Sequence, residues 1–209
     1  MKCEYTISKN KHYFKGPKFQ LSYIQIFLFI FLTSLGFTIN WIFFLLIFLV
    51  CFCLNRIIYN QLKNISYNVT FSDNCIYSLT ENYDQINKLF GVSETFHHWN
   101  SARIGWRCVD GENIELLAYC YVNKKRVYKK LINCKPNNLI NCNIQTNRDN
   151  YVLSAKTNDG DKNICYIPRV KFKLYSIFMY KLYPYFGGII SSPHDMNIKL
   201  EKTNEKNYK

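Results

Sequence analysis

One uncharged stretch constrains this chain more than any other feature. Residues Leu21 to Leu54 are 34 consecutive positions without a formal charge, and they are dense in Phe, Ile and Leu. About 20 helical residues span the ~30 Å hydrocarbon core of a bilayer. As one straight helix the run would reach about 50 Å, at a rise of about 1.5 Å per residue. The run therefore predicts a transmembrane segment, either one long tilted helix or two short helices folded as a hairpin.

The centre of the run favours the hairpin. Gly36, Thr38 and Asn40 are weak helix formers, and a turn there leaves two spans of about 15 residues each, near the short end of what crosses a bilayer. A hairpin also keeps the basic residues on both sides of the run on one side of the membrane, as the positive-inside rule prefers. The single-span alternative would export the rest of the chain, where Asn64 and Asn68 begin glycosylation motifs.

The chain is strongly basic, with a net charge of +13. Basic residues beside an apolar run are attracted to anionic lipid by roughly 1 kcal/mol each. We therefore expect the lipid bilayer as a partner, with the larger domain of the chain in the cytoplasm. Beyond the run, lysines and arginines are scattered among acidic residues, so nucleic acid is not an expected partner.

The nine cysteines form no CxxC pair, which argues against a zinc ribbon or a thioredoxin-like motif. Cys108 and Cys120 occupy apolar positions of strand patterns, where a buried thiol behaves as a small hydrophobic side chain. We favour free thiols in a reducing compartment. The alternative is that the six cysteines beyond the run form three disulfides.

Beyond the run, short alternating segments predict the fold. Ser101 to Val109 and Asn113 to Val122 alternate apolar and polar residues on either side of Asp110-Gly111, a hairpin turn signal. Turn signals recur about every ten residues, which is typical of an antiparallel β-sandwich or barrel. The only helix-like piece is short, Tyr83 to Phe90.

On this basis the chain divides into five segments. They are a basic polar flank (1–20), the transmembrane segment (21–54), a linker (55–65), a β-sandwich domain (66–200) and a polar tail (201–209). The sandwich domain is long enough to bury a core without metals or disulfides.

Several stretches of the sandwich domain carry a family resemblance. They are Asp84 to Gly91, His97 to Arg107, Glu115 to Tyr121, Lys181 to Gly188 and Pro193 to Ile198. Together they resemble an uncharacterised family of membrane-anchored bacterial proteins, common in Bacteroidetes, that has no known activity, and the resemblance implies a bacterial inner membrane. The resemblance covers residues 71–200 and implies a mainly β fold, an antiparallel sandwich of jelly-roll or lectin-like type preceded by the transmembrane helical segment. The chain departs from the family pattern at Trp99 and Cys108.

The candidate ligand site is the non-core face of the two strands joined at Asp110-Gly111. Residues two apart line one side of a strand. The side chains that share this face are Arg103, Arg107, Glu115, Tyr119 and Tyr121. Guanidinium groups bind carboxylates and phosphates in a bidentate manner, and tyrosine rings stack on sugars. The alternative is a solvated sheet face with Arg–Glu pairs across the strands.

Four further residues are candidates for the rim of a groove beside this face: His98, Tyr183, Tyr185 and His194. The two tyrosines belong to a Tyr-Pro-Tyr-Phe-Gly-Gly motif whose glycines allow close backbone approach. Its aromatics could instead close the core. His97 and His98 are adjacent and therefore point to opposite faces of a strand, and no HxH or HxxxH spacing supports a metal site. We predict no metal and no cofactor.

The sequence holds no recognisable catalytic motif. Glu115 is the lone carboxylate among the strand residues of its face, whereas a retaining glycosidase uses two carboxylates about 5 Å apart. No GxSxG, P-loop or dinucleotide motif occurs. We therefore expect no catalytic residue and a non-enzymatic binding or scaffolding role at a membrane, with a carbohydrate, another anionic ligand or a protein as partner. Two alternatives stay open: a glycan-active hydrolase or lyase on the same sandwich, and a purely structural membrane subunit.

Overall fold

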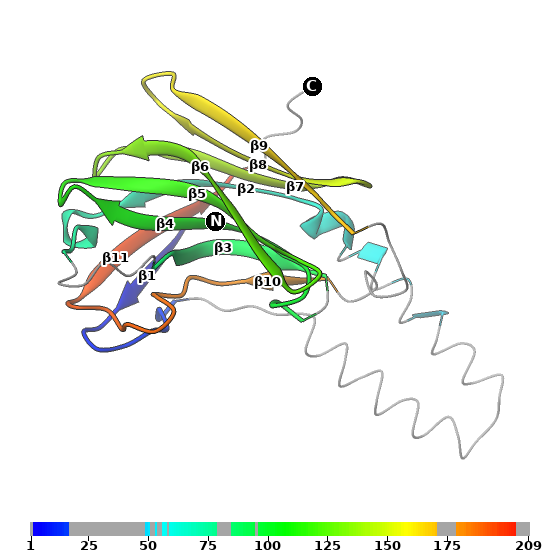
Figure 1. Ribbon diagram of the computed structural model, residues 1–209, viewed down its shortest axis with the longest axis horizontal. Coiled ribbons are helices and arrows are strands. Elements are labelled where there is room, and N and C mark those ends of the chain that lie inside the picture. The colour runs from blue at the N-terminus through cyan, green and yellow to red at the C-terminus, as the bar shows by residue number, and fades with distance from the viewer. Residues whose placement is uncertain are drawn as a thin grey trace, which may run out of the picture.

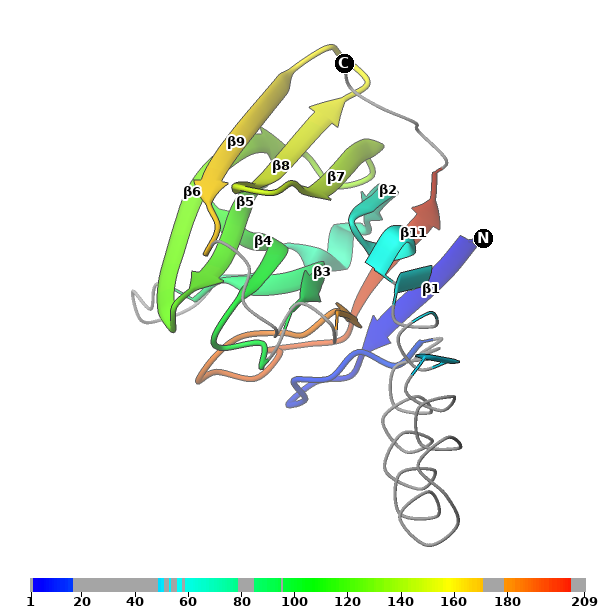
Figure 2. The ribbon, with the colours of Figure 1, turned by 90° about the vertical axis from the view of Figure 1, so that its right-hand side faces the viewer.

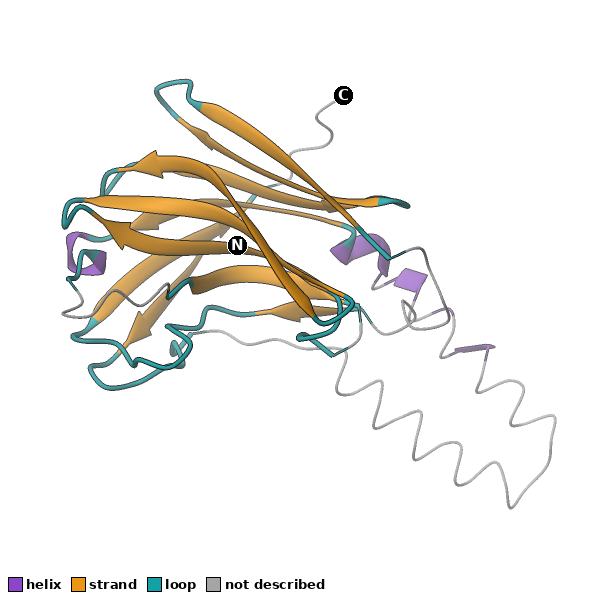
Figure 3. Cartoon of the chain, viewed as in Figure 1, coloured by secondary structure: helices purple, strands orange, loops and turns teal. Residues whose placement is uncertain are grey.

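The computed structural model describes residues 2–16, 49–50, 53, 56–57, 59–78, 85–94, 96–170 and 179–203. Most of them lie in strands, joined by a short 3₁₀ helix and by helical residues at 59–62 (Figures 1 and 3). The elements are β1 (Lys2–Ile7), β2 (Asn64–Phe71), η1 (Asp73–Cys75), β3 (Asn87–Ser93), β4 (Ser101–Val109), β5 (Asn113–Val122), β6 (Lys125–Cys134), β7 (Ile140–Thr146), β8 (Asn150–Thr157), β9 (Lys162–Pro168), β10 (Tyr180–Leu182) and β11 (Met196–Lys202).

The strands form two antiparallel sheets packed face to face, which Figure 2 shows nearly edge-on. The first sheet has the order β1-β11-β2-β7-β8-β9, and the second has the order β10-β3-β4-β5-β6. The prediction of a mainly β, antiparallel sandwich is therefore confirmed. The jelly-roll or lectin-like subtype stays a prediction.

The core lies between the two sheets and is rich in aromatic side chains. Trp106 of β4 is fully buried, with its ring centroid 5.1 Å from that of Phe71 on β2 and 6.1 Å from that of Phe186. Ala102 and Ile104 share the buried face of β4 with Trp106, as the alternation of this strand predicts. Burying a large apolar side chain contributes roughly 1.5–3 kcal/mol, so this face fixes which side of β4 points outward.

The first strand of the chain belongs to the sandwich. β1 pairs with β11 along its length, from Lys2 opposite Glu201 to Ile7 opposite Met196. Cys3, Tyr5 and Ile7 alternate and are buried. The predicted polar flank, residues 1–20, therefore contains a strand. Six residues of alternation are too short a signal to predict it beside a lysine-rich segment. The sandwich therefore includes a strand on each side of the apolar run.

The predicted transmembrane segment, 21–54, falls almost entirely outside the described residues, as do both its one-helix and its hairpin form. Among the residues that are described, no helix is long and apolar enough to cross a bilayer. Residues 59–62 are helical, and Tyr59 and Leu62 pack against the core just before β2 begins.

The helix expected over Tyr83 to Phe90 is wrong where the structure describes it, because β3 occupies Asn87–Ser93. A β-bulge lies between Lys88 and Phe90, and it buries Leu89 and Phe90 although they are adjacent. With Ile86 also buried, the apolar residues have the i, i+3, i+4 spacing of a helix. The bulge therefore imitates a helical pattern within a strand.

Candidate functional site

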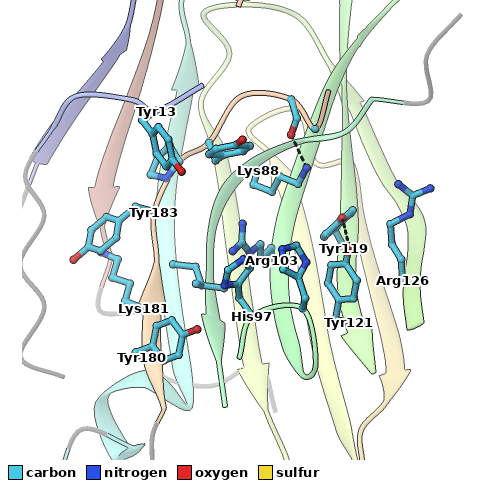
Figure 4. A pocket seen from close by; sticks show the side chains of 16 residues that line it. Tyr13, Lys88, His97, Arg103, Tyr119, Tyr121, Arg126, Tyr180, Lys181 and Tyr183 are labelled. Atoms are coloured by element: carbon cyan, nitrogen blue, oxygen red, sulfur yellow. Dashed lines mark hydrogen bonds between the residues drawn. The ribbon is translucent and has the colours of Figure 1, made fainter. Parts of the chain in front are cut away.

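A pocket of about 980 Å³ lies on the outer face of the five-stranded sheet (Figure 4). Strands β3 to β6 and β10 line it, together with residues 183–188, which follow β10, and Tyr13, which follows β1. The lining residues are Tyr13, Lys88, His97, His98, Arg103, Tyr119, Tyr121, Arg126, Tyr180, Lys181, Leu182, Tyr183, Pro184, Tyr185, Gly187 and Gly188. Among the residues that the structure describes, the lining holds four cationic side chains and six tyrosines but no carboxylate. We call it the basic pocket.

Arg103 lies in the middle of the basic pocket (Figure 4). It is opposite Gly91 on one side and Tyr119 on the other. A β-carbon at Gly91 would come within 2.6 Å of Arg103 Cγ, so the glycine leaves room for the arginine side chain. Among the described residues, no carboxylate forms an ion pair with Arg103. Burial lowers its pKa, although the nearby tyrosines oppose this effect.

Lys88 reaches the basic pocket from β3. Its Nζ donates a hydrogen bond to the carbonyl oxygen of Gly187 at 2.7 Å and lies 5.2 Å from the ring centroid of Tyr119. Burial, with the positive charges of Arg103 and Arg126, lowers the pKa of Lys88 to about 8. A bound anion would favour the charged ammonium of Lys88. The positive charges of the pocket therefore favour an anionic ligand.

Aromatic rings stand on both sides of these cations. The Tyr119 hydroxyl donates to the Tyr121 hydroxyl at 3.4 Å, and His98 lies edge-on to Tyr121 with ring centroids 5.1 Å apart. On the opposite side, Lys181 Nζ lies 5.2 Å from the Tyr183 ring centroid. Burial also lowers the pKa values of Lys181 and of His98. The rings provide flat surfaces between charged groups.

The wall formed by residues 183–190 is fixed to the start of β3. Tyr185 and Lys88 exchange two backbone hydrogen bonds, and Gly187 N donates to Asn87 Oδ1 at 2.6 Å. The Gln85 amide bonds both the N–H and the carbonyl of Ile190, each at 3.0 Å. Gly187 has φ 78°, and a β-carbon there would come within 2.1 Å of the Ile190 carbonyl oxygen. This wall is therefore preorganised, and it requires a glycine.

The structure brings together most of the residues singled out from the sequence. The pocket contains Arg103, Tyr119, Tyr121, His98, Tyr183 and Tyr185. Arg107 and Glu115 lie on the same sheet face but outside its lining, where Arg107 Nε donates to Glu115 Oε2 at 2.7 Å. Lys130 Nζ lies 3.6 Å from the other oxygen of that carboxylate. Arg107 and Glu115 therefore form the cross-strand ion pair that the sequence offered as the alternative to a ligand site.

His194 is not part of the basic pocket. Its Nε2 lies 2.8 Å from the carbonyl oxygen of Asn74, and the neighbouring Asp195 carboxylate accepts a hydrogen bond from Lys9 N at 2.7 Å. This segment shapes the turn into β11, as the Pro-His-Asp sequence before that strand suggests. Its partners, Asn74 and Lys9, are far from it along the chain and could not be predicted from the sequence.

Several pocket residues were not predicted from the sequence as part of the ligand site. They are Tyr13, Lys88, His97, Arg126, Tyr180 and Lys181. The helix-like spacing around Lys88 prevented the prediction of its strand. Arg126 could have been predicted, because it lies directly opposite Tyr121 across the β5–β6 turn. Tyr13 and Lys181 reach the pocket only through long-range strand pairing.

Most of the described cysteines are buried. Within the described part of the chain, the cysteines are free thiols, and burial raises the pKa of Cys75 and of Cys134 to about 12. A thiol needs its thiolate form to act as a nucleophile, so these two are inert at neutral pH. The described residues contain no group of three or more His, Cys, Asp or Glu side chains placed to hold a metal ion.

The fold and the pocket together define a β-sandwich protein with a basic, tyrosine-lined pocket on one outer sheet face. No family model matches the chain, and no curated protein matches it. The similar solved structures include the CBM2 module of Lactobacillus casei BL23 phage J-1 evolved Dit, with 10% identity and a TM-score of 0.35 over 65% of this chain. The match spans 61% of that module's chain. The resemblance to a Bacteroidetes-type family stays a prediction.

Proposed function

We propose that this chain is a membrane-anchored binding module that holds an anionic ligand in the basic pocket. The composition of the lining carries the proposal: among the described residues, Lys88, Arg103, Arg126 and Lys181 line the pocket together with six tyrosines and no carboxylate. A volume of about 980 Å³ lies within the range of small-molecule sites. Guanidinium and ammonium groups suit carboxylate, sulfate or phosphate, and the rings suit the flat faces of sugars. An acidic oligosaccharide combines both features.

The same lining supports binding rather than glycoside hydrolysis. A hydrolase needs a pair of carboxylates, and the nearest candidate from the sequence, Glu115, is engaged by Arg107 and Lys130 outside the pocket. The lyase alternative has one observation in its favour. Burial and neighbouring positive charge lower the pKa of His97 and of His98, which keeps a neutral base beside Arg103. If the protein releases unsaturated sugars from a polysaccharide, the binding proposal is wrong and the protein is a lyase.

The placement of β1 and β2 supports a hairpin anchor. β1 lies before the apolar run and β2 lies after it, yet both belong to one sheet with β11 between them. A single membrane crossing would put β1 and β11 on opposite sides of the bilayer. An inserted run must therefore cross an even number of times, and its 34 uncharged residues suffice for two short spans.

The binding proposal predicts a selective loss when Arg103 is neutralised. We expect Arg103→Met to weaken binding of a uronic-acid oligosaccharide about 10- to 100-fold, the usual size of one charge-assisted hydrogen bond. Arg107→Met is the matched control, because Arg107 lies on the same strand face but pairs with Glu115. Binding is measured by calorimetry on the full chain in detergent micelles, with thermal unfolding as the folding check.

The carboxyl-reduced form of the same oligosaccharide tests the charge requirement. We expect it to bind at least tenfold more weakly than the acidic form, about 1.4 kcal/mol. Equal binding of the two sugars, or equal losses in Arg103→Met and Arg107→Met, would contradict an anion site in the basic pocket.

A further inference from the structure

Two large aromatic side chains are exposed in the connection between β3 and β4. Phe96 is 71% exposed and Trp99 is 45% exposed. Their ring centroids are 5.8 Å apart, and Trp99 N donates to the Phe96 carbonyl oxygen at 2.7 Å, which closes a turn. Neighbouring exposed aromatics on a tight turn form an apolar surface without a partner in the described structure.

Cations flank this apolar surface. Lys124 Nζ lies 4.1 Å from the ring centroid of Trp99, and Lys124 N donates to the Trp99 carbonyl oxygen at 3.0 Å. Lys125 and Arg126 follow along the chain, and both are exposed. Trp beside Lys and Arg is the combination found at membrane interfaces, where the ring lies among headgroups and the cations meet phosphates. We call Phe96, Trp99, Lys124 and Lys125 the aromatic end.

The aromatic end lies at the same end of the sandwich as the residues that follow the apolar run. Figures 1 and 2 place the β3–β4 connection, the β5–β6 turn and the helical residues before β2 at one end of the two sheets. Contacts agree with this placement: Glu94, just after β3, forms an ion pair with Arg169, and Tyr59 in turn influences Arg169 electrostatically. Tyr59 is only five residues beyond the uncharged run.

We propose that the aromatic end rests on the anionic surface of the bilayer, with Phe96 and Trp99 among the lipid headgroups and Lys124 and Lys125 against their phosphates. The inference rests on the hairpin anchor proposed above. The contact holds the sandwich in one orientation and places the His97 and Tyr121 side of the basic pocket beside the headgroups. Each lysine strengthens the contact about fivefold at an anionic surface, and salt weakens it by screening.

Depth-dependent quenching of Trp99 by brominated lipid tests the proposal on the full chain. Trp41→Phe leaves two tryptophans, Trp99 and the fully buried Trp106, and further replacement of Trp99 gives the background. We expect lipids brominated near the headgroup to quench Trp99 in vesicles of phosphatidylcholine with phosphatidylglycerol. In pure phosphatidylcholine, or with Lys124→Gln and Lys125→Gln together, we expect this quenching to be lost.

A tryptophan at the far end of the sandwich is the matched control. Leu139 is 39% exposed and precedes β7, whose other end pairs with the start of β2. In the background lacking Trp41 and Trp99, Leu139→Trp should stay unquenched. Equal quenching at both positions, or none at Trp99, overturns the proposal. Protection of Trp99 that depends on protein concentration rather than on lipid assigns the surface to a second copy and also overturns it.

Flotation separates failure of this inference from failure of the anchor. If the chain floats with vesicles of either composition while Trp99 remains unquenched, the hairpin anchor stands and the surface contact is wrong. If the chain does not float with any vesicle, the anchor itself is wrong, and the orientation falls with it.

Discussion

At the scale of single residues, the titration of Lys88 is the most direct measure of the electrostatics of the basic pocket. Its pKa is lowered to about 8 by burial and by Arg103 and Arg126. The folded state therefore binds fewer protons than the unfolded chain between about pH 8 and 10.5, the ordinary pKa of a lysine. In this window Lys88 makes the ligand-free protein more stable as pH rises, because stability follows the difference in bound protons. Below about pH 8 the buried charge opposes folding.

Ligand binding should show the opposite dependence on pH. An anion stabilises the ammonium of Lys88, so binding takes up a proton, and affinity should fall by up to about tenfold per pH unit above pH 8. Calorimetry in buffers of different ionisation enthalpy measures this proton uptake. Lys88→Met should abolish the uptake, and Lys88→Arg should keep the affinity while flattening the profile. An unchanged pH dependence of affinity in Lys88→Met would show that Lys88 does not contact the ligand.

At the scale of elements, a buried polar cluster joins the two sheets. Glu94 follows β3 of the five-stranded sheet and pairs with Arg169, which follows β9 of the other sheet. The Tyr151 hydroxyl on β8 donates to Glu94 Oε2 at 3.0 Å, and Arg169 Nη1 donates to the Asn147 carbonyl oxygen at 2.7 Å. Burial alone lowers the pKa of Arg169, but Glu94 more than reverses this and the pKa is raised. The cluster thus fixes the two sheets relative to each other.

Breaking one member of this cluster should cost more than removing the ion pair as a whole. Glu94→Gln leaves the Arg169 charge buried without a carboxylate and should destabilise the fold by about 3–5 kcal/mol. Tyr151→Phe, which removes one hydrogen bond, should cost about 1–3 kcal/mol. Urea unfolding of the full chain in detergent measures both. In the double variant Glu94→Leu with Arg169→Met we expect a smaller loss than in Glu94→Gln, and a larger one would contradict the argument.

The elements also show which sequence patterns are reliable. β4 and β5 follow directly from alternation around Asp110-Gly111, where both residues have positive φ, and their register pairs Cys108 with Ile114. The same pattern does not identify β3, because the extra residue of its bulge changes the spacing of the apolar residues from two to that of a helix. Local patterns thus identify regular strands and miss irregular ones.

At the scale of the whole molecule, the proposed hairpin anchor predicts that both chain ends lie on one side of the membrane. Tags placed before Met1 and after Lys209 should be protected together from external protease in sealed cells, because β1 and β11 pair in one sheet. A tag inserted between Thr38 and Ile39, in the predicted turn of the run, should be cleaved. Protection of only one terminal tag would contradict the hairpin, and cleavage of both would place the sandwich outside.

Local sequence patterns sufficed to predict the sandwich class, the β4–β5 hairpin and much of the pocket's Arg and Tyr chemistry. These depend on a period of two and on turn residues, which act over a few positions. Tertiary structure alone decided that β1 joins β11 and that Lys88, Lys181 and Tyr13 enter the basic pocket. It also decided that the Arg107–Glu115 pair, which the sequence offered as an alternative, lies outside the pocket lining. The physical reason is distance along the chain: Lys2 pairs with Glu201, and no local pattern records a contact between residues so far apart.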